Sequence, residues 1–489
     1  MTHRRPRPWT YSVALLVLLL CSCGGRSGLF GGRGAGPMDS GGADLVLADA
    51  GAADARGRDL LGPDRQGPAP DLGPVPAEWS VTFGGSGSNM VRALAAAGPD
   101  AVYVAGAYSG KASFGPHACA SLGSYDIFLA RLGKDGGFRW VLCGGSSGHD
   151  SGLDLALGPG GDLWLSGEFN GTATLGGVAF SSTGSSDLFL ARVSPAGKVR
   201  WVVTGGGAGL DRGTTVAVDP ATGVAFLAGS ATLGASFGKH KVQASGLENS
   251  FFARVTAAGA FTWAVGAISD TWSRPVALGL STGGALHVAG NFGDKVTLGG
   301  HVLKGTATAH GYLARLDSAG KVTWALAATG PQKTELTAMD TDASGALFVT
   351  GTYKGQMALG SLKAPGPSGT TLFDRTFVAR FGPAGAGAWL LTDTSGDASG
   401  QGRVVRASPT SPATLYLLAN ASRSYSLGGH QIKDKGPFLA RLTTAGKATW
   451  SRSLQPQDGK VMALDTAGGV YLAYEESLNN ALRLYKLTP

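Results

Sequence analysis

The strongest constraint on the fold of this 489-residue chain is a tryptophan that recurs at an almost constant interval. The spacings are 61, 61, 62, 61, 65 and 61 residues, in the series Trp79, Trp140, Trp201, Trp263, Trp324, Trp389 and Trp450. Nine residues before each of the last six stands an arginine that ends a phrase such as FLAR: Arg131, Arg192, Arg254, Arg315, Arg380 and Arg441. A seventh, divergent phrase, LRLYKL, has Lys486 in the place of the arginine. A period of this length indicates a propeller or a solenoid.

Each repeat unit contains four short runs with the composition of β-strands. The tryptophan run, such as WVLCGG, is followed by a glycine-rich loop and then by LDLALG and LWLSGEF, which the turn PGGD separates. The FLAR run comes after a further stretch of about twenty residues. No run has the 3.6-residue period of a helix, and the 80 glycines suit tight turns. Two tight hairpins in each unit predict a four-stranded antiparallel sheet.

The strand faces and the ends of the repeat region predict a closed ring. Residues 127–132 leave only Arg131 polar, so both faces of such a sheet need cover. The run predicted to be innermost carries small residues such as Ala156 and Ala217, as strands near an axis require. The last unit stops after its third strand, whereas residues 78–83 form a fourth strand without the first three. Pairing them would remove two exposed edges. We therefore predict an all-β, seven-bladed β-propeller over residues 78–489, with four antiparallel strands per blade and a ring closed by the N-terminal strand.

The N-terminus has the pattern of an export signal. Three arginines precede the apolar run 11–20, which is too short to span a bilayer as a helix. Residues 1–22 resemble a bacterial lipoprotein signal peptide, because the small Ser22 precedes Cys23. The resemblance implies that Cys23 is lipidated and anchors the protein to a membrane. A simple secretory signal is the alternative. Gly24 is not the aspartate that retains such lipoproteins at the inner membrane, so we expect the outer membrane or the cell surface of the bacterial envelope.

Residues 23–77 differ in composition from the repeats. They are rich in glycine, alanine, aspartate and proline and bury too little apolar surface to fold, which predicts a disordered tether. Removal of the three signal-peptide arginines lowers the formal net charge from +8 to +5. The remaining basic residues form no block, so we expect no nucleic-acid partner. We also expect the protein to be a monomer.

The repeat unit resembles the bacterial β-propeller repeat of the SBBP type, which is found in exported proteins. The pattern consists of Y-V-x-G, D-x-F-[VL]-A-[KR]-L, a D-G turn, an aromatic residue and G-G-x-G-x-D. The first unit matches it at residues 103–106, 126–132, 135–136, 140 and 144–150. Later units keep Asp187 at the position of Asp126 but then carry Asn249, His310, Arg375 and Gly436. The resemblance covers roughly residues 78–489 and implies a propeller fold, but no particular activity.

No catalytic residues are visible in the repeats. The histidines form no HExxH or zinc pattern, and no G-x-S-x-G elbow has evident partners, so we predict no cofactor and leave calcium as the only open metal. Asn89, Asp150 and Asp211 occupy the tenth position after their tryptophans, on the face with the long loops. They either bind a cation or polar ligand or cap their loops, and we favour capping. We expect the repeated arginines and tryptophans to be structural.

Two cysteines, Cys119 and Cys143, remain in the repeat region. In an oxidising compartment they either form a disulfide or stay free, and the sequence leaves both outcomes open.

The long connections of a propeller emerge on one face, and binding sites are common on such loops. We therefore predict a membrane-anchored binding or interaction module that recognises an unknown protein or glycan through its long-loop face. Two alternatives stay open. One is a polysaccharide lyase or hydrolase with carboxylates from different blades at the axis. The other is a passive structural surface lipoprotein.

Overall fold

The computed structural model describes residues 78–489 except 233, 246–247, 282, 367–372, 394–398, 434, 455–460, 477–479 and 488–489. The predicted signal peptide, Cys23 and the tether lie outside the described residues. Within the described part the chain is all-β, as predicted, with strands and one short 3-10 turn, η1 (Pro159–Gly161). None of its described elements is a helix with the length and apolarity needed to cross a membrane.

The strands form sets of four that pair antiparallel in chain order, each named below by its first strand. The first strands are β2 (Asn89–Ala96), β8 (Ser151–Leu157), β14 (Arg212–Val218), β20 (Ser273–Ser281), β26 (Thr334–Thr341), β32 (Gly400–Ala407) and β38 (Val461–Leu464). The second strands are β3 (Ala101–Tyr108), β9 (Leu163–Phe169), β15 (Ala225–Ala231), β21 (Ala285–Phe292), β27 (Leu347–Tyr353), β33 (Thr414–Ala421) and β39 (Val470–Glu475).

The third strands carry the FLAR phrase and the fourth strands carry the repeated tryptophan. The third strands are β6 (Asp126–Gly133), β12 (Asp187–Val193), β18 (Asn249–Val255), β24 (His310–Leu316), β30 (Arg375–Phe381), β36 (Gly436–Thr443) and β40 (Ala481–Leu487). The fourth strands are β7 (Phe138–Gly145), β13 (Val199–Gly205), β19 (Phe261–Ile268), β25 (Val322–Thr329), β31 (Gly387–Thr392), β37 (Ala448–Ser453) and β1 (Trp79–Gly85). Strand β1 therefore comes first in the chain but pairs with the last strand, β40, through six residue pairs from Trp79↔Lys486 to Gly84↔Ala481.

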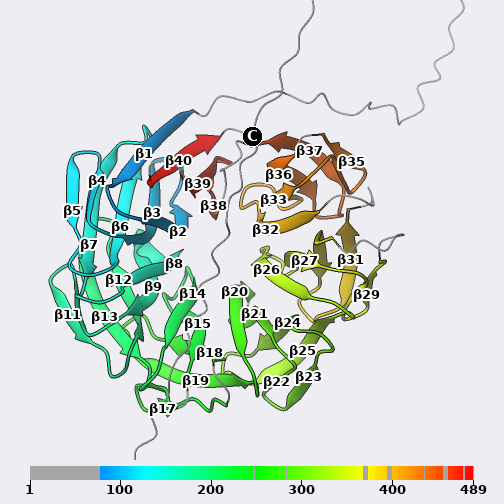
Figure 1. Ribbon diagram of the computed structural model, residues 1–489, viewed down its shortest axis with the longest axis horizontal. Coiled ribbons are helices and arrows are strands. Elements are labelled where there is room, and N and C mark those ends of the chain that lie inside the picture. Colours follow the sequence, from blue (N-terminus) through cyan, green and yellow to red (C-terminus); the bar gives the residue numbers. More distant parts are fainter. Residues whose placement is uncertain are drawn as a thin grey trace, which may run out of the picture. The chain divides into compact units, whose positions relative to one another are not determined.

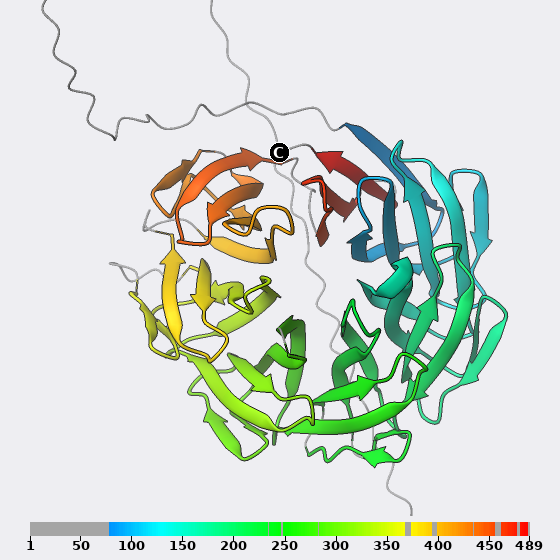
Figure 2. The same ribbon diagram turned by 180° about the vertical axis from the view of Figure 1, so that it is seen from behind.

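The sets follow one another around a common axis, with their first strands innermost (Figure 1, Figure 2). Each first strand contacts the first strand of the next set, and β38 contacts β2. Side chains tie these neighbours together. Asp154 on β8 accepts a hydrogen bond of 2.9 Å from the backbone N–H of Val216 on β14, and Asp340 on β26 accepts one of 2.8 Å from the N–H of Ala407 on β32. The apolar clusters lie between adjacent sets, so both faces of most sheets are covered.

Among the described residues, the stretch between the second and third strands contains a short hairpin in six of the sets, which the sequence pattern did not predict. The hairpins are β4 (Lys111–Phe114) with β5 (His117–Ala120), β10 (Thr172–Leu175) with β11 (Val178–Ser181), β16 (Ser236–Phe237) with β17 (His240–Lys241), β22 (Lys295–Leu298) with β23 (His301–Lys304), β28 (Met357–Leu359) with β29 (Leu362–Ala364), and β34 (Tyr425–Leu427) with β35 (His430–Ile432). In four of the hairpins the first strand pairs with the outer strand of the preceding set, as β4 does with β1 and β10 with β7. Strand β16 makes only an isolated bridge between Ser236 and Gly206, and β34 and β35 form a separate two-stranded sheet. The four paired hairpins therefore join neighbouring sets at their outer edges.

Candidate functional site

The repeated tryptophans lie where adjacent sets meet. The indole of Trp140 reaches the β8 set, where its Nε1 donates a hydrogen bond of 2.9 Å to the carbonyl oxygen of Pro195. Trp201 makes the same contact with Ala257 at 3.1 Å. A glycine follows each acceptor in the turn, and a methyl group on Gly197 would lie 2.9 Å from the Trp140 ring. The indole rings therefore fill the space between adjacent sets.

The repeated arginines occupy the middle of a cross-strand row in six of the sets, and Lys486 occupies this position between Tyr471 and Trp79 in the set that begins with β38. Each arginine pairs with an aromatic residue or histidine on the second strand and with the repeated tryptophan on the fourth, as in Trp164–Arg192–Trp201. The guanidinium of Arg192 lies 4.7 Å from the centre of the Trp164 ring. Its Nε donates to Asp162 at 2.8 Å, and its Nη1 donates to the carbonyl oxygen of Ala257 in the next set at 2.9 Å. This arginine is thus covered by the turn of the following set.

The three polar residues singled out on the long-loop face are buried, with exposed fractions of 5% for Asn89 and 0% for Asp150 and Asp211. Asp150 accepts hydrogen bonds from the backbone N–H of Ser146 at 2.7 Å and of Asn170 at 3.0 Å. Asp211 accepts them from Gly207 and Thr232, both at 2.7 Å. The Asn89 amide donates to the carbonyl oxygen of Gly87 at 2.9 Å. Each side chain holds its loop in shape.

Two of these residues face a second buried carboxylate. A methyl group on Gly145 would lie 2.1 Å from Asp126 Oδ1 and 3.0 Å from Asp150 Oδ2. No described residue forms a hydrogen bond with Asp126 Oδ1. Burial raises the pKa of Asp126, and the charge of Asp150 raises it further. Asp187 and Asp211 are arranged in the same way across Gly206.

The third unit replaces this pair by neutral groups. Asn249, which stands at the position of Asp126, accepts a hydrogen bond of 3.0 Å from the backbone N–H of Ser269 and donates one of 3.2 Å to its carbonyl oxygen. The amide thus supplies a donor that an aspartate lacks unless it is protonated. Among the described residues no group of three or more His, Cys, Asp or Glu side chains is placed to hold a metal ion.

Cys119 on β5 and Cys143 on β7 lie side by side, with Cα atoms 6.2 Å apart and their sulfurs in contact. This separation falls within the range of natural disulfides. A bond there would fasten the first hairpin to the outer strand of its own set.

Two carboxylates on the innermost strands, Asp154 and Asp340, have a raised pKa because they are buried. The positive charge of Arg406 and the backbone donors that tie the sets partly offset this effect. Because both carboxylates hold neighbouring strands together, we assign them a structural role.

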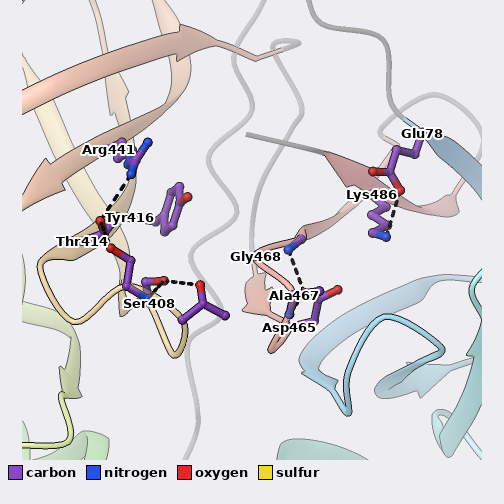
Figure 3. Close-up of a pocket in the computed structure, with 12 residues that line it drawn as sticks. Glu78, Ser408, Thr414, Tyr416, Arg441, Asp465, Ala467, Gly468 and Lys486 are labelled. Carbon is purple, nitrogen blue, oxygen red and sulfur yellow. Dashed lines mark hydrogen bonds and ion pairs between the residues drawn. The ribbon is translucent and has the colours of Figure 1, made fainter.

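A pocket of about 390 Å³ lies between the β32 set and the β38 set (Figure 3). One side is formed by the turn after β32, with Ser408 and Thr410, together with Tyr416 and Arg441 of β33 and β36. The other side is formed by the turn after β38 at residues 465–469, and by Glu78 and Lys486. Most of these residues lie in or next to the short turns of the two sets, at the opposite ends of the strands from the loops predicted to bind.

The charged side chains of the pocket differ in the interactions that they form. Asp465 is fully buried and accepts hydrogen bonds from the backbone N–H groups of Ala467 and Gly469 at 2.8 and 2.7 Å, and from the Tyr471 hydroxyl at 3.0 Å. Glu78 forms an ion pair of 2.9 Å with Lys486. The remaining charge is that of Arg441.

Arg441 differs from the other repeated arginines in its exposure. It is exposed, whereas the other five are only partly so. Its Nη2 lies 3.5 Å from Thr414 Oγ1, a weak contact (Figure 3). Sequence reasoning treated Arg441 as one of six equivalent residues and did not identify this pocket. The degenerate last unit and the longer turn at 408–413 were the available signals.

No model of a known protein family matches the chain, and no curated protein matches it either. The SBBP resemblance therefore depends on the quoted motifs alone. Among solved structures, the Dos1 propeller is 8% identical, with a TM-score of 0.40, and the match covers 84% of this chain and 94% of that one. Chaetomium thermophilum Sqt1 bound to the N-terminus of the ribosomal protein L10 is 12% identical, with a TM-score of 0.42 and coverage of 83% and 98%. A second structure of Sqt1 is 10% identical, with a TM-score of 0.38.

Proposed function

We propose that residues 78–489 form a seven-bladed β-propeller whose last blade is completed by the N-terminal strand. Seven four-strand sets can be counted when β38, β39, β40 and β1 are taken as one. Two contacts support closure, namely the six-pair ladder between β1 and β40 and the contact between β38 and β2. Closure would leave no exposed outer edge between the first and last units.

We further propose that the propeller is exported and anchored through a lipid on Cys23 at the outer membrane or the cell surface. The support comes from the sequence, where a basic segment, an apolar run and Ser22 precede this cysteine. Growth with a radiolabelled fatty acid should label the chain, and Cys23→Ser should abolish the label and release the protein from the membrane fraction. Persistent label in Cys23→Ser would show that the anchor is elsewhere.

The proposed function is that of a binding module, and the pocket of Figure 3 is its recognition site. The observation that carries this proposal is that Arg441 is exposed and lines the pocket. The pocket is large enough to hold part of a ligand. The acidic side chains of the pocket are held by hydrogen bonds or an ion pair, which fits binding better than proton transfer. Asn89, Asp150 and Asp211 are buried and hydrogen-bond to backbone groups of their own loops, so we do not propose them as ligand-binding residues.

A pair of matched substitutions tests this assignment. The purified full chain is immobilised and exposed to envelope proteins of the producing bacterium. Thr410→Trp places an indole at the exposed rim of the pocket, and Ser344→Trp places one on the corresponding turn of the β26 set. We expect Thr410→Trp to reduce recovery of a specific partner at least about tenfold, which corresponds to 1.4 kcal/mol, and Ser344→Trp to leave it unchanged. Equal recovery by both variants would reject the pocket as the site.

A further inference from the structure

Arg441 carries a positive charge that no described acidic side chain neutralises at ion-pair distance. In the β8 set the equivalent Arg192 is paired with Asp162 at 2.8 Å. The acidic residues of the pocket interact with other groups. Asp465 accepts hydrogen bonds from two backbone N–H groups and a hydroxyl, and Glu78 forms an ion pair with Lys486. A guanidinium presents a planar fork of N–H donors that matches the two oxygens of a carboxylate.

The rim of the pocket beside Arg441 is formed by hydroxyl groups. Ser408 Oγ and Thr410 Oγ1 are 3.2 Å apart, and Ser411 Oγ and Thr414 Oγ1 are 2.9 Å apart. Each hydroxyl both donates and accepts hydrogen bonds, so this rim can pair with the amide groups of a peptide next to its carboxylate. A pocket that combines one fixed positive charge with such a rim selects an anionic, hydrogen-bonding ligand.

The aromatic side chain in the pocket argues against a sugar ring as that ligand. Tyr416 has an exposed fraction of only 6%, and it lies opposite Arg441 across the β33–β36 ladder. Burial raises the pKa of its hydroxyl, while the charge of Arg441 opposes the rise. Its ring therefore offers no open face on which a sugar could stack.

We infer that this pocket binds an acidic peptide segment of a partner protein, with a side-chain or terminal carboxylate held by the Arg441 guanidinium and flanking amides held by the hydroxyl rim. The inference depends on the proposed function, since it specifies the ligand of that same site.

The test measures fluorescence anisotropy of a labelled hexapeptide of alternating alanine and glutamate on the purified full chain. We expect saturable binding that weakens with salt, because the contact is between charges. We expect at least about tenfold weaker binding for the matching alanine–glutamine peptide and for Arg441→Gln, a loss of 1.4 kcal/mol or more. Arg254→Gln is the control, because it removes the same repeated arginine from a set that does not line the pocket.

A second variant guards against misfolding of Arg441→Gln. Thr410→Glu adds a competing carboxylate to an exposed turn and should weaken peptide binding as much, with an unchanged melting temperature. Free glutamate and a digalacturonate are the other ligands. Weaker binding of both than of the peptide supports the inference. It is overturned if digalacturonate binds more tightly in an Arg441-dependent way, if free glutamate binds as tightly as the peptide, or if no peptide binds at about 1 mM.

The two proposals fail in different ways. If Thr410→Trp loses the partner protein but the parent chain does not bind the glutamate peptide, the binding module is supported and the acidic peptide is refuted as its ligand. Variants of the pocket that change neither partner recovery nor peptide binding would refute both.

Discussion

Replacement of Phe83 by alanine tests the proposed closure of the ring, because this side chain joins β1 to the set that follows it. Phe83 has an exposed fraction of 4%, and its ring centre lies 5.7 Å from that of Phe114, 6.2 Å from Phe128 and 5.4 Å from Phe138. A Phe→Ala change in such a core costs about 3–5 kcal/mol. Since a domain is stable by only about 5–15 kcal/mol, we expect a large loss, near 5 °C in melting temperature for a chain of this length.

The control is Phe251→Ala, which removes the same side chain from a site within the β14 set. Phe251 is fully buried, with its ring centre 4.5 Å from that of Phe237. Both variants should melt earlier by circular dichroism. Only Phe83→Ala should also loosen β1 and expose the edge of β40, so light scattering should show association that grows with concentration. If Phe83→Ala stays monomeric and melts no earlier than the parent, β1 does not close the ring.

Three further predictions concern other parts of the repeat region. The intact mass should rise by two hydrogens when the Cys119–Cys143 pair is reduced. Cys119→Ser should lower the free energy of unfolding by about 3 kcal/mol, because the disulfide closes a loop of this length. Two free thiols before reduction would refute the pairing. Burial raises the pKa of Asp126 in the folded chain, so the contribution of this carboxyl to stability is lost as pH rises above about 4. The free energy of unfolding of Asp126→Asn should therefore equal that of the parent near pH 3 and exceed it by about 1 kcal/mol at pH 7. An equal difference between the two proteins at both pH values would contradict this prediction. Gly197→Ala should destabilise more than Gly177→Ala by about 1–3 kcal/mol, since both have a positive φ (80° and 83°) but only the former meets an indole; equal losses would show that the backbone alone is responsible.

The strands could be predicted because the repeat fixes their positions. The tryptophan spacing and the FLAR phrase mark the fourth and third strands, and the paired ends of the repeat region indicated that β1 would pair with β40. The hairpins were not predicted, although a signal was present. Leu-Gly-Gly precedes Val178, His301 and His430, and its two glycines form the turn of three of these hairpins. Their strands have only two to four residues, too few for a pattern of alternation to stand out.

The pocket could not be predicted from the residue types that form it. Arg441 and Arg254 follow the same local sequence pattern and pair with tryptophan in the same register. What distinguishes them is their exposure, because Arg441 is exposed and Arg254 is only partly exposed, and exposure depends on residues far away in the chain. The roles of Asp150 and Asp211 were easier to anticipate, because an acidic residue after a glycine-rich loop commonly caps it.

The position of β1 determines where a pulling force would enter the molecule. This strand follows directly on residue 78, so tension transmitted from the N-terminal side would reach β1 before any other described strand. Along the strand direction such a load would shear the six β1–β40 pairs together, whereas a load across it would break them one after another. The hairpin that begins with β4 holds the far end of β1, and Cys119 and Cys143 lie just behind it. Among the described strands, the β1–β40 ladder is therefore the first to bear such a load.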